Sequence, residues 1–95
     1  MGSPTLPDRL EPTGSLNHRD LGDEFLFYDR DGDQVHVLNG VAREVFLLCD
    51  GNRTNPQIVS EIIERYEVEA ERARDDVLRT LSELLELQIL RAAAA

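Results

Sequence analysis

The residues with the clearest potential for chemistry are one cysteine, two histidines and a short run of aspartates. Cys49 is the single cysteine of the chain, so it can form no internal disulfide and cannot hold a metal ion alone. Its neighbours are apolar, which favours a buried core thiol over a reactive one. His18 and His36 have no cysteine at a zinc-ligand spacing. We therefore expect neither histidine to bind a metal.

The aspartates at positions 29, 31 and 33 resemble the opening of a calcium-binding loop. Such a loop requires glycine at its sixth position and glutamate at its twelfth. Counted from Asp29, however, Gly32 is the fourth residue and Gly40 the twelfth. We interpret the run as a solvated hairpin turn. Because all ten basic residues are arginines, lysine chemistry is also excluded, and we predict no metal, no cofactor and no catalytic activity.

The charge and the apolar content of the chain narrow the class of protein. Nineteen acidic residues against ten basic ones give a net charge of −9, which repels phosphate backbones and argues against nucleic-acid binding. No apolar run approaches the roughly 20 residues that cross a bilayer, and the first residues lack a secretory pattern. We expect a cytoplasmic protein without membrane association.

A chain of 95 residues predicts one domain. Residues 1–15 contain three prolines and two glycines with few large apolar side chains, so we expect a flexible N-terminal tail. Three short stretches rich in aromatic and β-branched residues follow, and they predict strands at residues 16–19, 24–28 and 34–38. The Asp31-Gly32 pair suits a tight hairpin turn between the last two strands.

From Gly40 onward the apolar spacing becomes helical. Asn39 is placed to cap a first helix that Asp50-Gly51 ends. Thr54, with Pro56 and Gln57 after it, has the capping-box spacing and opens a second helix. A third helix is expected over residues 69–86, followed by a last apolar segment and a frayed end at residues 92–95. This order predicts an α+β fold, a small three-stranded antiparallel sheet followed by a three-helix, winged-helix-like bundle over residues 16–91.

A winged-helix-like body is also compatible with DNA binding, so an acidic winged-helix transcription regulator is the alternative function. The third helix, which would enter the groove, carries six acidic residues against three arginines. A groove-binding helix needs basic residues for phosphate contacts, so the charge disfavours this alternative. A dimeric structural subunit is a third hypothesis, because an open strand edge can also pair between copies.

Several segments of the chain together resemble the PqqD-like family, the RiPP recognition elements. The resemblance covers about residues 16–91. The segments are Leu21-Gly22-Asp23-Glu24, His36-Val37-Leu38-Asn39, Ala42, Leu48-Cys49-Asp50-Gly51 with Arg53-Thr54, Asp76-Val77 with Leu81 and Leu84, and Ile89-Leu90.

The resemblance implies a non-catalytic protein that binds the leader segment of a ribosomally synthesised precursor peptide. It also implies a partner maturation enzyme, which in such systems is a radical SAM enzyme, a peptidase or a cyclase/dehydratase. In the proteins that the chain resembles, the leader pairs as an extra strand beside the third strand, in a groove next to the third helix.

The residues themselves support such a site. A short third strand after a hairpin can present unpaired backbone groups, which is the template for strand addition. The third helix can add apolar pockets and an arginine for an acidic leader side chain. We therefore expect the peptide to contact Gln34, Val35, His36, Val37 and Leu38 on the strand, and Arg74, Val77, Leu78 and Leu81 on the helix.

Overall fold

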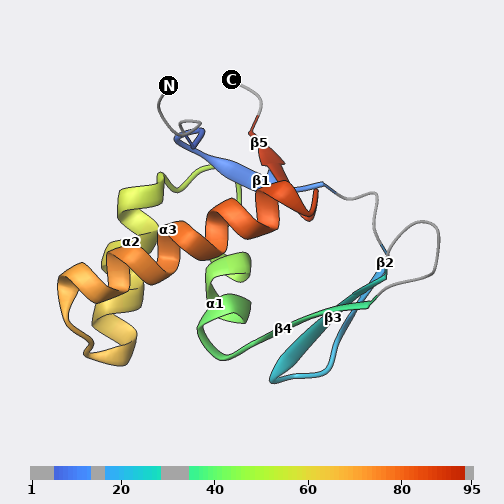
Figure 1. Cartoon of the computed structure of the whole chain (residues 1–95), viewed down its shortest axis with the longest axis horizontal. Helices are drawn as coiled ribbons and strands as arrows, with labels where there is room; N and C mark the ends of the chain where they lie inside the picture. Colours follow the sequence, from blue (N-terminus) through green and yellow to red (C-terminus); the bar gives the residue numbers. More distant parts are fainter. Residues whose placement is uncertain (1–5, 14–16, 29–34, 94–95) are drawn as a thin grey trace.

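The computed structural model describes residues 6–13, 17–28 and 35–93 of the chain. Its elements follow in the order β1 (Leu10–Pro12), β2 (Asn17–Asp20), β3 (Glu24–Tyr28), β4 (Val35–Asn39), α1 (Gly40–Leu48), α2 (Asn55–Tyr66), α3 (Ala70–Glu86) and β5 (Leu90–Ala92). Figure 1 shows a three-stranded sheet at one end, three helices at the other, and a small two-stranded sheet where the two ends of the chain meet. The predicted α+β class is confirmed.

The three-stranded sheet is antiparallel with the order β2-β3-β4. Each predicted strand is present. The first is shifted by one residue to Asn17–Asp20, and the third ends one residue later than predicted, at Asn39. Between β2 and β3 the side chain of Asp20 accepts a hydrogen bond from the backbone N–H of Gly22, whose φ of 95° requires glycine. The predicted turn at residues 29–33 lies outside the described residues, as does Gln34.

The second sheet pairs β1 with β5, near opposite ends of the sequence. Leu10 is fully buried there, and the Glu11 carboxylate pairs with Arg91 at 2.8 Å. The expectation that residues 1–15 form a flexible tail is therefore wrong for residues 6–13, and the frayed end predicted for residues 92–95 is wrong for Ala92 and Ala93. Sequence patterns do not predict this sheet because each strand has only three residues. Each strand is stabilised by pairing with a strand about 80 positions away in the sequence.

The helices begin and end largely as predicted. Thr54 caps α2 in a full capping box, in which Gln57 N–H donates to Thr54 Oγ1 at 3.4 Å and Thr54 N–H donates to Gln57 Oε1 at 2.8 Å. Gly51, just after α1, has a φ of 83° and packs against β1, where an added Cβ would lie 3.2 Å from the Glu11 carboxylate. The structure does not describe the side chain of Asn39, so the helix cap predicted there stays a prediction.

One hydrophobic core joins the two sheets and the three helices. Phe25 and Phe27 project from β3 onto Phe46 of α1, with ring centroids 5.2 and 4.9 Å apart. The buried stripe of α3 consists of Ala73, Val77, Leu81 and Leu84. In the part of the chain that the structure describes, no helix has the length and apolarity needed to cross a membrane.

Candidate functional site

The outer edge of β4 is the first feature of interest. In the sheet order β2-β3-β4, β4 is paired with β3 on one side, and among the described residues no strand is paired with its other side. Every other backbone group of an edge strand points outward without a partner in the sheet. β4 continues directly into α1, which packs against α3. The edge therefore belongs to a strand that is anchored at one end by the helical body.

The side chains of β4 alternate between the core and solvent. Leu38 is buried and lies opposite Phe25, while His36 is half-buried opposite Phe27. Val35 and Val37 point the other way and are 51 % and 49 % exposed. The two valines are thus available beside the open edge, whereas Leu38 anchors the strand to the core.

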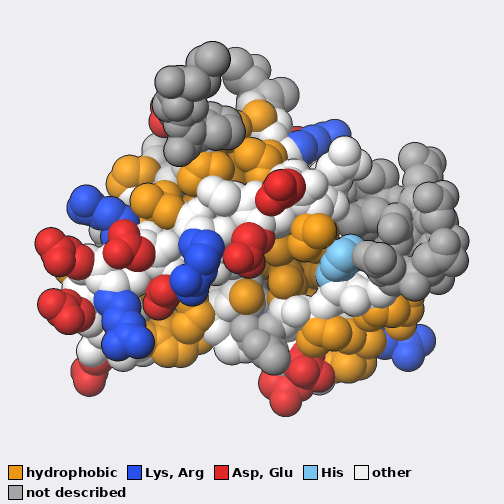
Figure 2. Space-filling view, in the orientation of Figure 1, with side chains coloured by type: hydrophobic (Ala, Val, Ile, Leu, Met, Phe, Trp, Pro, Cys, Tyr) orange, Lys and Arg blue, Asp and Glu red, His pale blue; other side chains and the backbone are white. Residues whose placement is uncertain are grey.

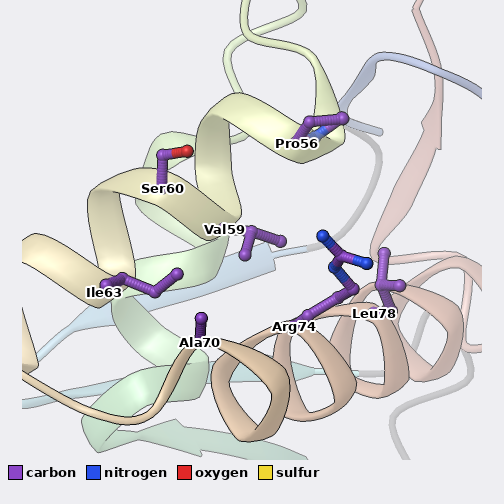
Figure 3. A pocket seen from close by; sticks show the side chains of 7 residues that line it. All are labelled: Pro56, Val59, Ser60, Ile63, Ala70, Arg74 and Leu78. Atoms are coloured by element: carbon purple, nitrogen blue, oxygen red, sulfur yellow. The ribbon is translucent and has the colours of Figure 1, made fainter.

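The site residues expected on α3 do not share one groove with β4. Val77 and Leu81 are fully buried in the core, so neither offers a surface to a ligand here. Arg74 and Leu78 instead line a pocket of about 240 Å³ between α2 and α3 (Figure 3). Its lining residues are Pro56, Val59, Ser60, Ile63, Ala70, Arg74 and Leu78, and none of them comes from β4. Consecutive helical residues differ by 100° around the axis, which puts Arg74 and Leu78 on the flank of α3 that faces α2.

The opposite flank of α3 carries residues that were not among the predicted peptide contacts. Counting 100° per residue from the buried stripe, Asp76, Thr80 and Glu83 lie on the side away from α2. Asp76 and Thr80 are half-buried and Glu83 is exposed. Figure 2 shows hydrophobic side chains on the surface between α3 and the three-stranded sheet, with acidic side chains beside them. A helical-wheel analysis could have found this flank, but not which neighbour it faces.

A cation above an aromatic cluster fixes the three-stranded sheet on α1. The Arg43 guanidinium lies 5.2 Å from the centre of the Phe25 ring and pairs with Asp20 at 3.0 Å. The backbone N–H of Gly22 and then Arg43 hold the pKa of Asp20 below its usual value. His18 lies beside the same aromatic rings, 5.8 Å from the centre of Phe27. These contacts tie β2, β3 and α1 together and so set the direction of β4.

Cys49 and the residues after it have a structural role. The Cys49 thiol is buried and donates a hydrogen bond to the carbonyl of Val45 at 3.2 Å. Burial raises the pKa of this thiol to about 12, so it stays protonated and is a poor nucleophile. Among the described residues, no group of three or more metal-ligating side chains comes together.

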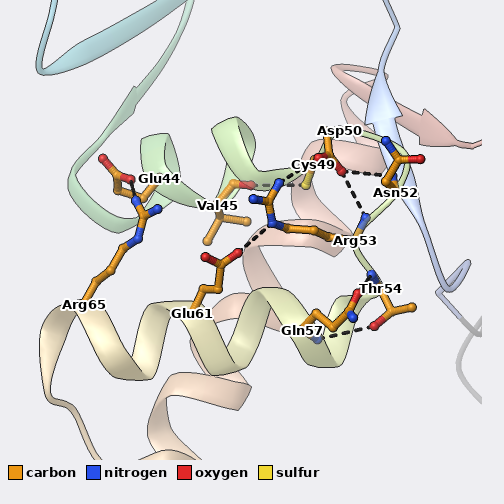
Figure 4. Close-up of polar contacts among 10 residues, drawn as sticks. All are labelled: Glu44, Val45, Cys49, Asp50, Asn52, Arg53, Thr54, Gln57, Glu61 and Arg65. Carbon is orange, nitrogen blue, oxygen red and sulfur yellow. Dashed lines mark hydrogen bonds and ion pairs between the residues drawn. The ribbon is translucent and has the colours of Figure 1, made fainter.

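The loop between α1 and α2 is held by a charged network, which Figure 4 shows. The Asp50 carboxylate accepts hydrogen bonds from the backbone N–H groups of Asn52 and Arg53, and these lower its pKa. The Arg53 guanidinium pairs with Asp50 at 2.7 Å and with Glu61 of α2 at 2.6 Å. The Asp-Gly-x-Arg-Thr segment of the sequence therefore stabilises the turn between α1 and α2.

The sequence from β3 to β5 matches a known protein family. The family model described as "Coenzyme PQQ synthesis protein D (PqqD)" matches residues 24–90. The chain belongs to the PqqD family. The matched residues run from the start of β3 to the first residue of β5, so they include the open edge of β4 and all three helices of this PqqD-family chain.

A solved structure has the same fold. It is described as TbiB1 in complex with the TbiA(beta) leader peptide, and it superposes on 90 % of this PqqD-family chain and 99 % of its own chain with a TM-score of 0.74. The sequence identity is 19 %, so the likeness establishes the fold. None of the curated protein sequences matches the chain.

Proposed function

We propose that this PqqD-family protein binds the leader segment of a ribosomally synthesised precursor peptide. It would present the leader to a maturation enzyme in the cytoplasm and catalyse no reaction itself. The observation that carries the proposal is the edge of β4, with which no described strand pairs, in a chain of this family. The similar TbiB1 was solved with a leader peptide bound, which supports the same class of ligand here.

In this proposal the leader adds a strand to the β4 edge. Backbone hydrogen bonds, each contributing about 1 kcal/mol net, supply affinity with little demand on the leader sequence. Side chains supply the specificity. Val35 and Val37 would contact the leader directly, because they are half exposed beside the edge. Gln34, at the start of the expected contact segment, and the half-buried His36 complete the proposed strand contacts.

On α3 we assign the ligand-facing role to the flank away from α2. Asp76, Thr80 and Glu83 replace Arg74 and Leu78 as the proposed helical contacts, since the latter two line a different pocket. Leu38, Val77 and Leu81 would support the groove from the core without touching the leader.

A charge placed at Val37 tests this site. We expect Val37→Glu to weaken leader binding about tenfold, a loss of about 1.4 kcal/mol, because it puts a carboxylate in a contact that is otherwise apolar. Fluorescence anisotropy with a labelled leader from a neighbouring precursor gene measures the dissociation constant. Leu47→Glu is the matched control, since Leu47 is an apolar residue on α1 with a similar exposed fraction.

Two results would count against the proposal. One is wild-type protein that fails to bind the leader but binds duplex DNA, offered as a rival ligand. The other is an equal loss of leader affinity in Val37→Glu and Leu47→Glu, which would place the peptide away from the β4 edge.

A further inference from the structure

The pocket between α2 and α3 is separate from the proposed leader site. Its walls are mainly apolar, with Val59 and Ile63 from α2 and Leu78 from α3. Figure 3 shows Arg74 turned toward α2, with its guanidinium group close to Leu78. A volume of about 240 Å³ is too small for a folded element but suits one or two inserted side chains.

Arg74 lines the pocket and, like Arg9, Arg19 and Arg72 elsewhere, pairs with no carboxylate among the described residues. Five others form ion pairs with carboxylates at 2.6–3.6 Å, namely Arg43, Arg53, Arg65, Arg79 and Arg91. Arg74 makes no ion pair with any residue that the structure describes, although acidic residues outnumber basic ones almost two to one. A guanidinium that lines a mainly apolar pocket, without a carboxylate partner in the described part of the chain, favours a ligand that has a carboxylate beside an apolar group.

Two exposed apolar residues lie between pocket-lining residues in the sequence. Tyr66 ends α2 and Val68 lies in the turn between α2 and α3, and each is 40 % exposed. Ile63 and Ala70, on either side of them in the sequence, both line the pocket. The exposed carboxylates of Glu67, Glu69 and Glu71 flank these residues in the sequence. Glu69 and Glu71 are the sequence neighbours of Ala70, which lines the pocket, and Arg74 lines it one turn further along α3. Exposed apolar surface with a polar rim is typical of a protein docking site.

We propose that this pocket docks a segment of a partner protein, in which apolar side chains enter between α2 and α3. A carboxylate on one side of these side chains pairs with Arg74, and a basic residue on the other side meets the glutamates of the turn. That the partner is the maturation enzyme rests on the proposed function, whereas the chemistry of the pocket does not. Because no residue of β4 lines the pocket, the partner segment and the leader can bind at the same time.

The test uses a defined probe, the pentapeptide acetyl-Lys-Ala-Phe-Leu-Glu-amide, and a counterpart in which glutamine replaces the glutamate. Nuclear magnetic resonance follows the methyl groups of Val59, Ile63 and Leu78 during titration of the full chain. We expect shifts at these methyl groups and at least threefold tighter binding of the glutamate peptide. Equal binding of both peptides, or shifts confined to other residues, would overturn the proposal.

Two variants distinguish a specific ion pair with Arg74 from a general effect of positive charge on α3. We expect Arg74→Gln to remove the preference for the glutamate peptide, while Arg72→Gln, an exposed arginine on the same helix, keeps it. Loss of the preference in both variants would contradict a specific pairing. A companion leader titration distinguishes the two proposals, since Arg74→Gln should leave leader affinity within twofold of wild type. A larger fall would make the leader itself the occupant and overturn the assignment to a partner protein.

If the leader does not bind but the pentapeptide binds the pocket, the proposed function is wrong and the pocket proposal stands. If the leader binds but the pentapeptide does not, the pocket proposal is wrong and the proposed function stands.

Discussion

At the scale of single residues, several polar side chains make contacts that stabilise the fold. Cys49 is buried against α1, His18 lies against the rings of β3, and Asp50 holds the loop before α2. A side chain whose polar atom is satisfied by a backbone carbonyl or amide next to the core is poorly placed to act on a substrate. Cys49 and Asp50 therefore have structural roles.

Cys49 provides a prediction about the pH dependence of stability. Its pKa is raised from 9.0 to about 12 by burial, so between these values the unfolded chain loses the thiol proton while the folded chain keeps it. The free energy of unfolding should therefore fall as the pH rises from about 9 toward 12, by up to about 1.4 kcal/mol per pH unit. Urea denaturation at several pH values measures this slope.

The control for this prediction is Cys49→Ala, because tyrosines also ionise at high pH. The difference in slope between the wild type and the variant isolates the thiol. Identical slopes would mean that Cys49 ionises equally in both states and is not shielded from water.

At the scale of the elements, the unexpected pairing of β1 with β5 makes the N-terminal segment part of the domain. Asn55, the first residue of α2, is buried and donates its side-chain amide to the carbonyl of Pro7 at 2.8 Å. The backbone N–H of Gly51 donates to the carbonyl of Leu10. The segment thus contacts the α1–α2 loop as well as β5, and it closes one end of the core.

Shortening Leu10 tests this role. We expect Leu10→Ala to lower the free energy of unfolding by about 2–5 kcal/mol, the usual cost of removing a fully buried leucine side chain. Chemical denaturation measures the change. Leu47→Ala, at an exposed leucine of α1, should change stability by less than about 0.5 kcal/mol, and a similarly small effect at Leu10 would show that β1 is dispensable.

At the scale of the whole molecule, the two surfaces that we propose for ligands are separate. One is the open edge of β4 with the flank of α3 that carries Asp76, Thr80 and Glu83. The other is the pocket between α2 and α3. A protein with two such surfaces could hold a flexible peptide and an enzyme together, which raises the local concentration of the peptide at the enzyme.

Hydrogen exchange can separate the two surfaces in the intact protein. Leader binding should slow the exchange of outward-pointing amides in residues 35–39 at least tenfold, because a new strand would pair with them. Amides of α2 around Val59 and Ile63 should change little. Measurement by mass spectrometry with and without leader gives both values. Protection of α2 with no change in β4 would contradict the strand-addition proposal.

Much of the fold follows from local patterns in the sequence. The period of the apolar residues determined the three helices, the Thr54 capping box determined the start of α2, and the alternation in residues 24–28 determined the central strand. Such signals depend on neighbours within a few positions, so they can be recognised without knowledge of the tertiary structure. The family resemblance carried by the same residues pointed to the third strand as the binding edge.

Tertiary structure alone decided the rest. Leu10–Pro12 has no pattern of its own and becomes a strand because Leu90–Ala92 lies beside it after folding. The sequence shows that Arg74 and Asp76 lie on different flanks of α3, but not that α2 covers the first flank. The physical reason is that helical periodicity defines angles around an axis, whereas the neighbour at each angle depends on contacts between residues far apart in the chain.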